Sequence, residues 1–102
     1  MTKKRARTER RERERAAVKL AEARIKLARL EAGGTPEHPI DVTSASVVEP
    51  HASSLPCASC GEQGVRIEEH VAEQGLRIAR VRCPKCGFRR AIYFKLGTTL
   101  AS

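Results

Sequence analysis

Aromatic side chains are scarce in this chain of 102 residues, which contains two Phe, one Tyr and no Trp. A chain with so few large side chains cannot build an extensive aromatic core, and small cores usually need an additional staple. The length allows one small domain with extensions rather than two full domains. We therefore expect the cysteines to stabilise the fold, either through a metal or through disulfides.

The sequence also lacks a secretory signal and any long apolar segment. Its N-terminus is charged and has no apolar h-region, and no apolar run approaches the roughly 20 residues that cross a bilayer. These absences predict a cytoplasmic protein with no membrane partner. In a reducing cytoplasm, paired cysteines favour a metal over a disulfide.

All four cysteines fall in two C-x-x-C-G units, residues 57–61 and 83–87. Two such units at this separation are typical of one tetrahedral four-thiolate site, which predicts a single structural Zn²⁺. The predicted ligands are Cys57, Cys60, Cys83 and Cys86. Because four cysteine ligands leave no open position for water or a small-molecule substrate, we expect no enzyme activity.

Alternating apolar and polar residues predict strands over residues 65–71 and 76–82, on either side of a turn at Glu73-Gln74-Gly75. A third strand is expected over 88–96, ending at Gly97. Together they predict a three-stranded antiparallel sheet that carries both cysteine loops.

With these features the chain resembles the zinc-ribbon group of folds over residues 55–97. The match rests on the hairpin between the two units and on Cys57, Cys60, Gly61, Cys83, Pro84, Cys86 and Gly87. The resemblance implies the fold and the metal but no single function, because zinc ribbons occur in transcription factors, polymerase subunits, ribosomal proteins, primases and small adaptors. Ribbons that cleave transcripts carry an Asp-Glu pair at the hairpin tip. Glu73 alone approaches the tip here, so that activity is not expected.

The net charge of +8 is unevenly distributed. Residues 1–32 hold twelve Lys/Arg against five Glu, residues 33–56 hold three acids and no Lys/Arg, and residues 57–102 hold eight Lys/Arg against four Glu. A basic excess of this kind predicts contact with a polyanion, either nucleic acid or an acidic protein surface.

Two basic groups are candidates for nucleic-acid contact. One is the N-terminal arm, which we expect to be disordered when free and which is either a solvated tail or a phosphate-contacting arm. The other lies on the third strand, where basic residues either form a binding face with one aromatic or offset the charge of the metal site. The candidates are Lys3, Lys4, Arg5, Arg7, Arg10, Arg11, Arg13 and Arg15 in the arm, and Arg89, Arg90, Tyr93 and Lys95 on the strand.

Residues 16–32 predict an amphipathic helix with two apolar rows. One row is spaced 4, 3, 4 and 3 residues apart, the other follows the complementary pattern, and Gly33-Gly34 end the helix. The rows are Ala16, Leu20, Ala23, Leu27 and Leu30, and Val18, Ala21, Ile25, Ala28 and Ala32. The stripe either docks on the chain's own ribbon, stays exposed, self-associates or binds a protein partner.

The predicted organisation is a small α+β protein with a basic arm and long helix over 1–32, a Pro/Ser-rich linker over 33–54, the ribbon over 55–97 and a tail over 98–102. Four of the five prolines lie in residues 33–56, so we expect extended backbone there and no helix, with residues 39–42 and 46–48 able to pair briefly with a sheet edge. His38, His51 and His70 are expected to be ordinary side chains. The predicted function is non-enzymatic nucleic-acid binding in a transcription or translation assembly, and the alternative is a protein–protein adaptor.

Overall fold

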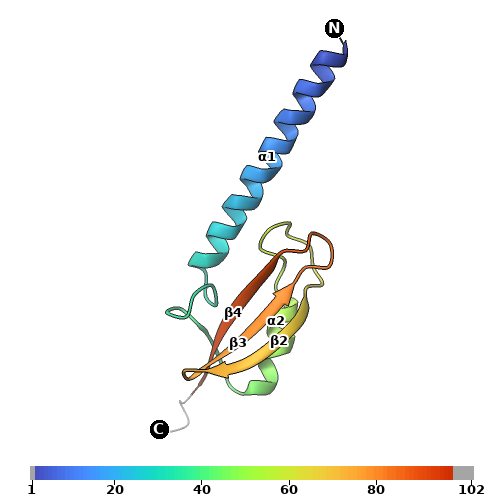
Figure 1. The fold of residues 1–102 in the computed structure, drawn as a ribbon. Helices are drawn as coiled ribbons and strands as arrows, with labels where there is room; N and C mark the ends of the chain where they lie inside the picture. Colours follow the sequence, from blue (N-terminus) through green and yellow to red (C-terminus); the bar gives the residue numbers. More distant parts are fainter. Residues whose placement is uncertain (1, 98–102) are drawn as a thin grey trace.

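The computed structural model describes residues 2–97, with side chains from residue 6 onward, and it shows a small α+β fold (Figure 1). The predicted tail at 98–102 lies outside the described residues. The elements are, in order, α1 (Thr2–Leu30), β1 (Ile40–Val42), the 3-10 helix η1 (Ala45–Val47), α2 (Val48–Ser54), β2 (Arg66–Glu73), β3 (Leu76–Arg82) and β4 (Arg89–Leu96).

The sheet has four strands in the order β1-β4-β3-β2 and is mixed rather than purely antiparallel. The β2–β3 and β3–β4 pairs are antiparallel, as the sequence predicts. The predicted count of three strands is wrong because β1 pairs parallel to β4, with Ile40 opposite Phe94. The short pattern of residues 39–42 allows pairing with a sheet edge, but by itself it does not specify the partner strand. The ladder partner and the Gly97 N–H, which donates to the Val42 carbonyl at 2.6 Å, hold β1 in place.

The segment predicted to be an extended linker, residues 33–54, instead contributes β1, η1 and α2 to the fold. Pro50 is compatible with α2 because it occupies the first turn, where a backbone N–H has no acceptor within the helix. Val48 and Ala52, four residues apart, are both 0% exposed. Their burial on the sheet stabilises a helix that local propensity does not favour.

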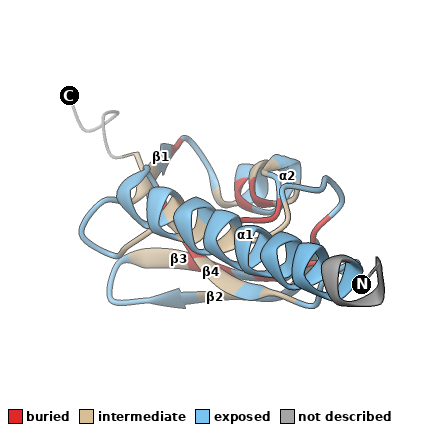
Figure 2. Cartoon of the chain, turned by 90° about the horizontal axis from the view of Figure 1, so that it is seen from above, coloured by how far each residue is buried: buried red, intermediate tan, exposed pale blue. Residues whose placement is uncertain are grey.

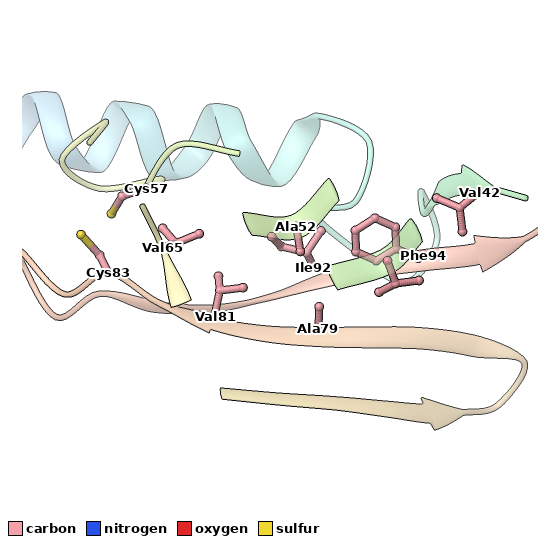
Figure 3. Close-up of a cluster of buried hydrophobic side chains, with 10 residues drawn as sticks. Val42, Ala52, Cys57, Val65, Ala79, Val81, Cys83, Ile92 and Phe94 are labelled. Atoms are coloured by element: carbon pink, nitrogen blue, oxygen red, sulfur yellow. The ribbon is translucent and has the colours of Figure 1, made fainter. Parts of the chain in front are cut away.

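The core lies between α2 and one face of the sheet. Ala79 and Val81 of β3 and Ile92 and Phe94 of β4 are buried on this face (Figure 3). The ring of His51 in α2 meets the ring of Phe94 edge-on, with 5.6 Å between the centroids. Figure 2 shows no helix over β2 on the opposite side of the sheet, which is the open face of the described chain, although α1 borders this face at β4, where Ile25 and Ala28 line a groove with Tyr93.

Helix α1 is longer at its N-terminus than the sequence predicts, because residues 2–15, expected to be a disordered arm, continue the helix. Its N-terminal half extends past the ribbon, and the described chain measures 71 × 22 × 18 Å (Figure 1). Ala21, Ile25 and Ala28 of one predicted apolar row are half-buried. The other row stays exposed, with 53% of Leu20 and 77% of Leu30 accessible. No helix in residues 2–97 combines the length and apolar character that a membrane crossing requires.

After α1 the chain turns back tightly at Gly33 and Gly34. Gly33 is buried and has a φ of 90°, which favours glycine. Its N–H donates to the His38 carbonyl at 2.7 Å, and its own carbonyl accepts the N–H of Tyr93 at 2.9 Å. The turn therefore joins the end of α1 to β4 and positions the helix beside the ribbon.

Candidate metal centre

The four cysteine sulfurs meet at one end of the sheet, and all lie within 4.8 Å of one another. The Cys57 and Cys86 sulfurs are 3.6 Å apart, and those of Cys60 and Cys83 are 3.7 Å apart. A tetrahedral zinc site with Zn–S bonds of about 2.3 Å requires sulfurs separated by about 3.8 Å. The cluster therefore has the size, number and type of donors that fit one four-coordinate metal ion, and it is compatible with zinc.

The two C-x-x-C-G units fold alike. Gly61 donates its N–H to the Cys57 carbonyl, and Gly87 donates to the Cys83 carbonyl, each at 2.9 Å. The first cysteine of each unit also donates its N–H to the carbonyl five residues later, again at 2.9 Å. Positive φ values of 79° and 80° at the two glycines allow these turns. Each unit thereby holds its two sulfurs ready for the same ion.

Backbone N–H groups donate hydrogen bonds to three of the four sulfurs. Cys57 Sγ accepts from the N–H of Ser59 at 3.3 Å and of Cys60 at 3.5 Å. A hydrogen bond from the N–H of Cys86 lowers the pKa of Cys83 to about 7, against the opposing effect of desolvation. The N–H of Glu62 acts in the same direction on Cys60, but desolvation and the neighbouring thiols outweigh it and raise the pKa of Cys60 to about 12. Four thiols this close cannot all ionise without a cation between them.

The centre is continuous with the hydrophobic core. Cys57 and Cys83 are 4% and 1% exposed and pack with Val65 and Val81 in the core cluster, whereas Cys86 is exposed. Figure 3 shows Cys57 and Cys83 with their sulfurs directed toward each other. A metal at this position would tie the first unit to the end of β3 and close one end of the core.

Two further contacts reinforce the centre. Lys85 Nζ of the second unit pairs with Glu62 Oε1 beside the first unit at 3.2 Å. Arg24 of α1 donates from Nη1 to the carbonyls of Cys60 at 3.1 Å and Ser59 at 3.5 Å. Nothing in the sequence distinguishes Arg24 from the other basic residues of the helix, so sequence reasoning misses this contact.

The basic candidates lie in two separate places. Arg7, Arg10, Arg11, Arg13 and Arg15 are all exposed on α1, on the part of the helix that extends past the ribbon (Figure 1). Lys3, Lys4 and Arg5 belong to the same helix, but their side chains lie outside what the structure describes. The structure thus places the arm away from the candidates on β4.

The four candidates on β4 do not share one face, since neighbouring strand residues point to opposite sides. Arg89, Tyr93 and Lys95 lie on the open face, whereas Arg90 lies on the side of the core residues Ile92 and Phe94. Desolvation lowers the pKa of Arg90, although the nearby Glu31 opposes this shift. Arg90 and Arg24 both line a groove of about 550 Å³ between α1, α2 and the first cysteine unit. Of the four candidates on β4, only Arg89, Tyr93 and Lys95 therefore share one face.

None of the histidines joins the metal cluster within residues 2–97. His70 Nδ1 lies 2.9 Å from Glu49 Oε2, which connects β2 to α2. His51 packs on Phe94 as described above. His70 and His51 thus serve the packing of α2 on the sheet.

Comparison with known proteins assigns no family: no family model, no curated protein and no solved structure matches the chain. The likeness to zinc ribbons therefore rests on the four-cysteine cluster and on the hairpin between the two units. Function has to be argued from the chain's own surfaces.

Proposed function

We propose that this chain is a non-enzymatic zinc-ribbon protein that binds nucleic acid in the cytoplasm, as an accessory factor in transcription or translation. The observation that carries the proposal is the basic N-terminal half of α1. Every described side chain from Ala6 to Leu20 is exposed, and this stretch extends past the ribbon (Figure 1). Because this part of the helix buries none of its described side chains, its arginines are accessible to phosphates.

The metal has a structural part in this proposal. One zinc ion held by Cys57, Cys60, Cys83 and Cys86 would cross-link the two units and add the binding energy of the metal to a small core. The backbone N–H groups that reach the Cys57 and Cys83 sulfurs orient these two ligands. In this proposal the metal centre holds the ribbon and the docked end of α1 in place. The basic surfaces contact the nucleic acid.

A salt titration tests the proposal with the full chain. Binding to random-sequence DNA and RNA is measured at increasing salt for the parent chain and for a variant with Arg7→Gln, Arg10→Gln and Arg11→Gln. Each lost phosphate contact should reduce the slope of log K against log salt by about 0.7 to 0.9, because fewer counterions are released. Gln retains good helix propensity, so α1 should persist.

A matched control replaces Glu9, Glu12 and Glu14 of the same helix with Gln. This triple variant changes as many side chains but raises the positive charge, so it should bind at least as tightly as the parent chain. Absence of binding by the parent chain at low salt to both DNA and RNA would refute the proposal.

An adaptor function is the second candidate, and the exposed apolar row of α1 favours it. Leu20, Leu27 and Leu30 are 53%, 57% and 77% exposed and recur at spacings of seven and three residues. Such a row can bind in an apolar groove on the surface of a partner protein. Sedimentation of the parent chain and of Leu20→Glu plus Leu27→Glu tests whether the row supports self-association. If the parent chain is a monomer at all concentrations, self-association is excluded. The adaptor would then bind a different protein with an acidic surface.

A further inference from the structure

Three arginines form a row across the open face of the sheet, next to the cysteine units. Arg66 of β2 lies opposite Arg82 of β3, and Arg82 lies opposite Arg89 of β4. All three are exposed, and neighbouring strands are about 4.8 Å apart. Like charges placed directly opposite each other destabilise a sheet, so the row is unfavourable for folding alone.

The row does not face the metal centre. Along β3, Val81 and Cys83 belong to the core on the α2 side, so Arg82 between them points to the open face. Val65, which precedes Arg66, is likewise a core residue. Offsetting the negative charge of the thiolates therefore does not explain why the three arginines are aligned on the other face.

Two members of the row make no ion pair within the described residues, although Glu68 of β2 reaches across β3 to the third member. Arg89 Nε pairs with Glu68 Oε1 at 3.1 Å. Within residues 2–97, Arg66 and Arg82 have no ion pair and no side-chain hydrogen bond. The guanidinium groups of Arg66 and Arg82, which lie opposite each other in the ladder, are thus available to bind an anion.

An apolar row lies farther along the same face. Val71 is opposite Ile78, and Ile78 is opposite Tyr93. Ile78 is 6% exposed but stands apart from the core cluster, and Val71 and Tyr93 are half-buried beside it. The open face thus offers an aromatic ring on an apolar support at a few residues' distance from the arginines.

We propose that the open face of the sheet binds single-stranded nucleic acid, with Arg66, Arg82 and Arg89 holding phosphates and Tyr93 stacking on a base. This inference rests on the proposed function and assigns its second surface. Single strands expose the flat faces of their bases, which stack on aromatic side chains, whereas a duplex keeps these faces inside the helix. The combination of guanidinium groups with an aromatic ring on one flat face therefore favours single strands.

The decisive variant is Arg66→Gln plus Arg82→Gln in the full chain, titrated with a single-stranded oligonucleotide at increasing salt. Loss of two phosphate contacts should lower the salt slope by about 1.4, since each contact on a single strand contributes about 0.7. The matched control, Lys26→Gln plus Arg77→Gln, removes the same charge from α1 and from the opposite side of β3 and should leave the slope unchanged. Zinc content and the circular dichroism spectrum verify that each variant is folded.

Tyr93→Leu tests the stacking contact separately. It should weaken single-strand binding about tenfold with an unchanged salt slope, because stacking releases no counterions, and it should not affect binding to a duplex of the same sequence. Equal effects of Tyr93→Leu on both, or none on either, would refute the single-strand assignment.

The outcomes separate this inference from the proposed function. If the arm variant lowers the slope while the Arg66 and Arg82 variant matches its control, the chain binds nucleic acid but not through the sheet, and the inference is wrong. If the parent chain binds no nucleic acid, both proposals are wrong.

Discussion

Arg24 of α1 donates a hydrogen bond to the carbonyl of Cys60 at 3.1 Å and thereby joins the long helix to the loop that carries a candidate metal ligand. The two residues are 36 positions apart in the chain. Besides this contact, the half-buried Ala21, Ile25 and Ala28 make the docking surface of α1, and the two alanines bury little area. The Arg24 guanidinium therefore adds a polar contact to a small apolar docking surface.

Replacing Arg24 with Met should loosen the docked part of α1 without disturbing the metal ligands. We expect faster hydrogen exchange in residues 20–30, a loss of about 1 kcal/mol of stability and an unchanged metal content, because the sulfurs keep their own N–H donors. Lys26→Met, at an exposed position of the same helix, is the control. Equal exchange in both variants would mean that Arg24 does not hold the helix.

Removal of the metal should unfold the ribbon. Cys57 and Cys83 are core residues as well as candidate ligands, so removal of a bound ion would leave buried, mutually close thiols in place of a cross-link. Metal binding in such modules contributes roughly 10–16 kcal/mol, which exceeds the typical stability of a small domain. Chelation, or Cys83→Ser, should abolish the sheet signal in circular dichroism. A sheet that persists with less than one zinc per chain would contradict this prediction.

Gly33→Ala should destabilise the chain more than Gly64→Ala. Both glycines have positive φ, at 90° and 96°, so the backbone strain is similar. A Cβ at Gly33 would lie 2.7 Å from Ile40 Cδ1, whereas a Cβ at Gly64 would meet nothing within 4 Å. We expect Gly33→Ala to cost at least about 1 kcal/mol more in denaturant unfolding. Equal costs would show that the turn after α1 is not tightly packed.

Ala52→Asp should displace α2 from the sheet. Ala52 is 0% exposed, and an unpaired carboxylate there should cost about 3 kcal/mol or more in denaturant unfolding. Ser54→Asp, at the exposed end of the same helix, gives up the hydrogen bond to the His51 carbonyl and should cost only about 1 kcal/mol. If both variants are equally stable, residues 48–54 behave as the flexible linker that the prolines suggest.

The sequence predicts those parts of the fold that are determined by residues close together in the chain. The period-two alternation over 65–71 and 76–82 and the turn before Leu76 locate the central hairpin, and the cysteine spacing locates the sulfur cluster. The sequence indicates a possible edge pairing for residues 39–42 but not its partner strand, and it does not predict α2, because both elements are stabilised by residues far away in the chain. Ile40 pairs with Phe94, and Ala52 is buried against the sheet.

The basic surfaces of the sheet also depend on residues that are distant in the chain. Alternation alone separates the neighbours Arg89 and Arg90 on the predicted strand, but only the burial of Ile92 and Phe94 shows which of the two lies on the core side. The alignment of Arg66 with Arg82 depends on the bulge between Ile67 and Glu69, which shifts the pairing of β2 with β3. Since a one-residue shift reverses every side chain of a strand, these surfaces become visible only when the register is known.

The strand order also determines how the sheet meets other molecules at its two sides. One outermost strand, β1, is three residues long, and the other, β2, carries a bulge and exposed charges such as Glu68 and Glu69. Short, irregular or charged borders discourage the addition of a foreign strand. The ribbon can therefore present a wide open face to a ligand and still resist growing into fibrils with other copies of itself.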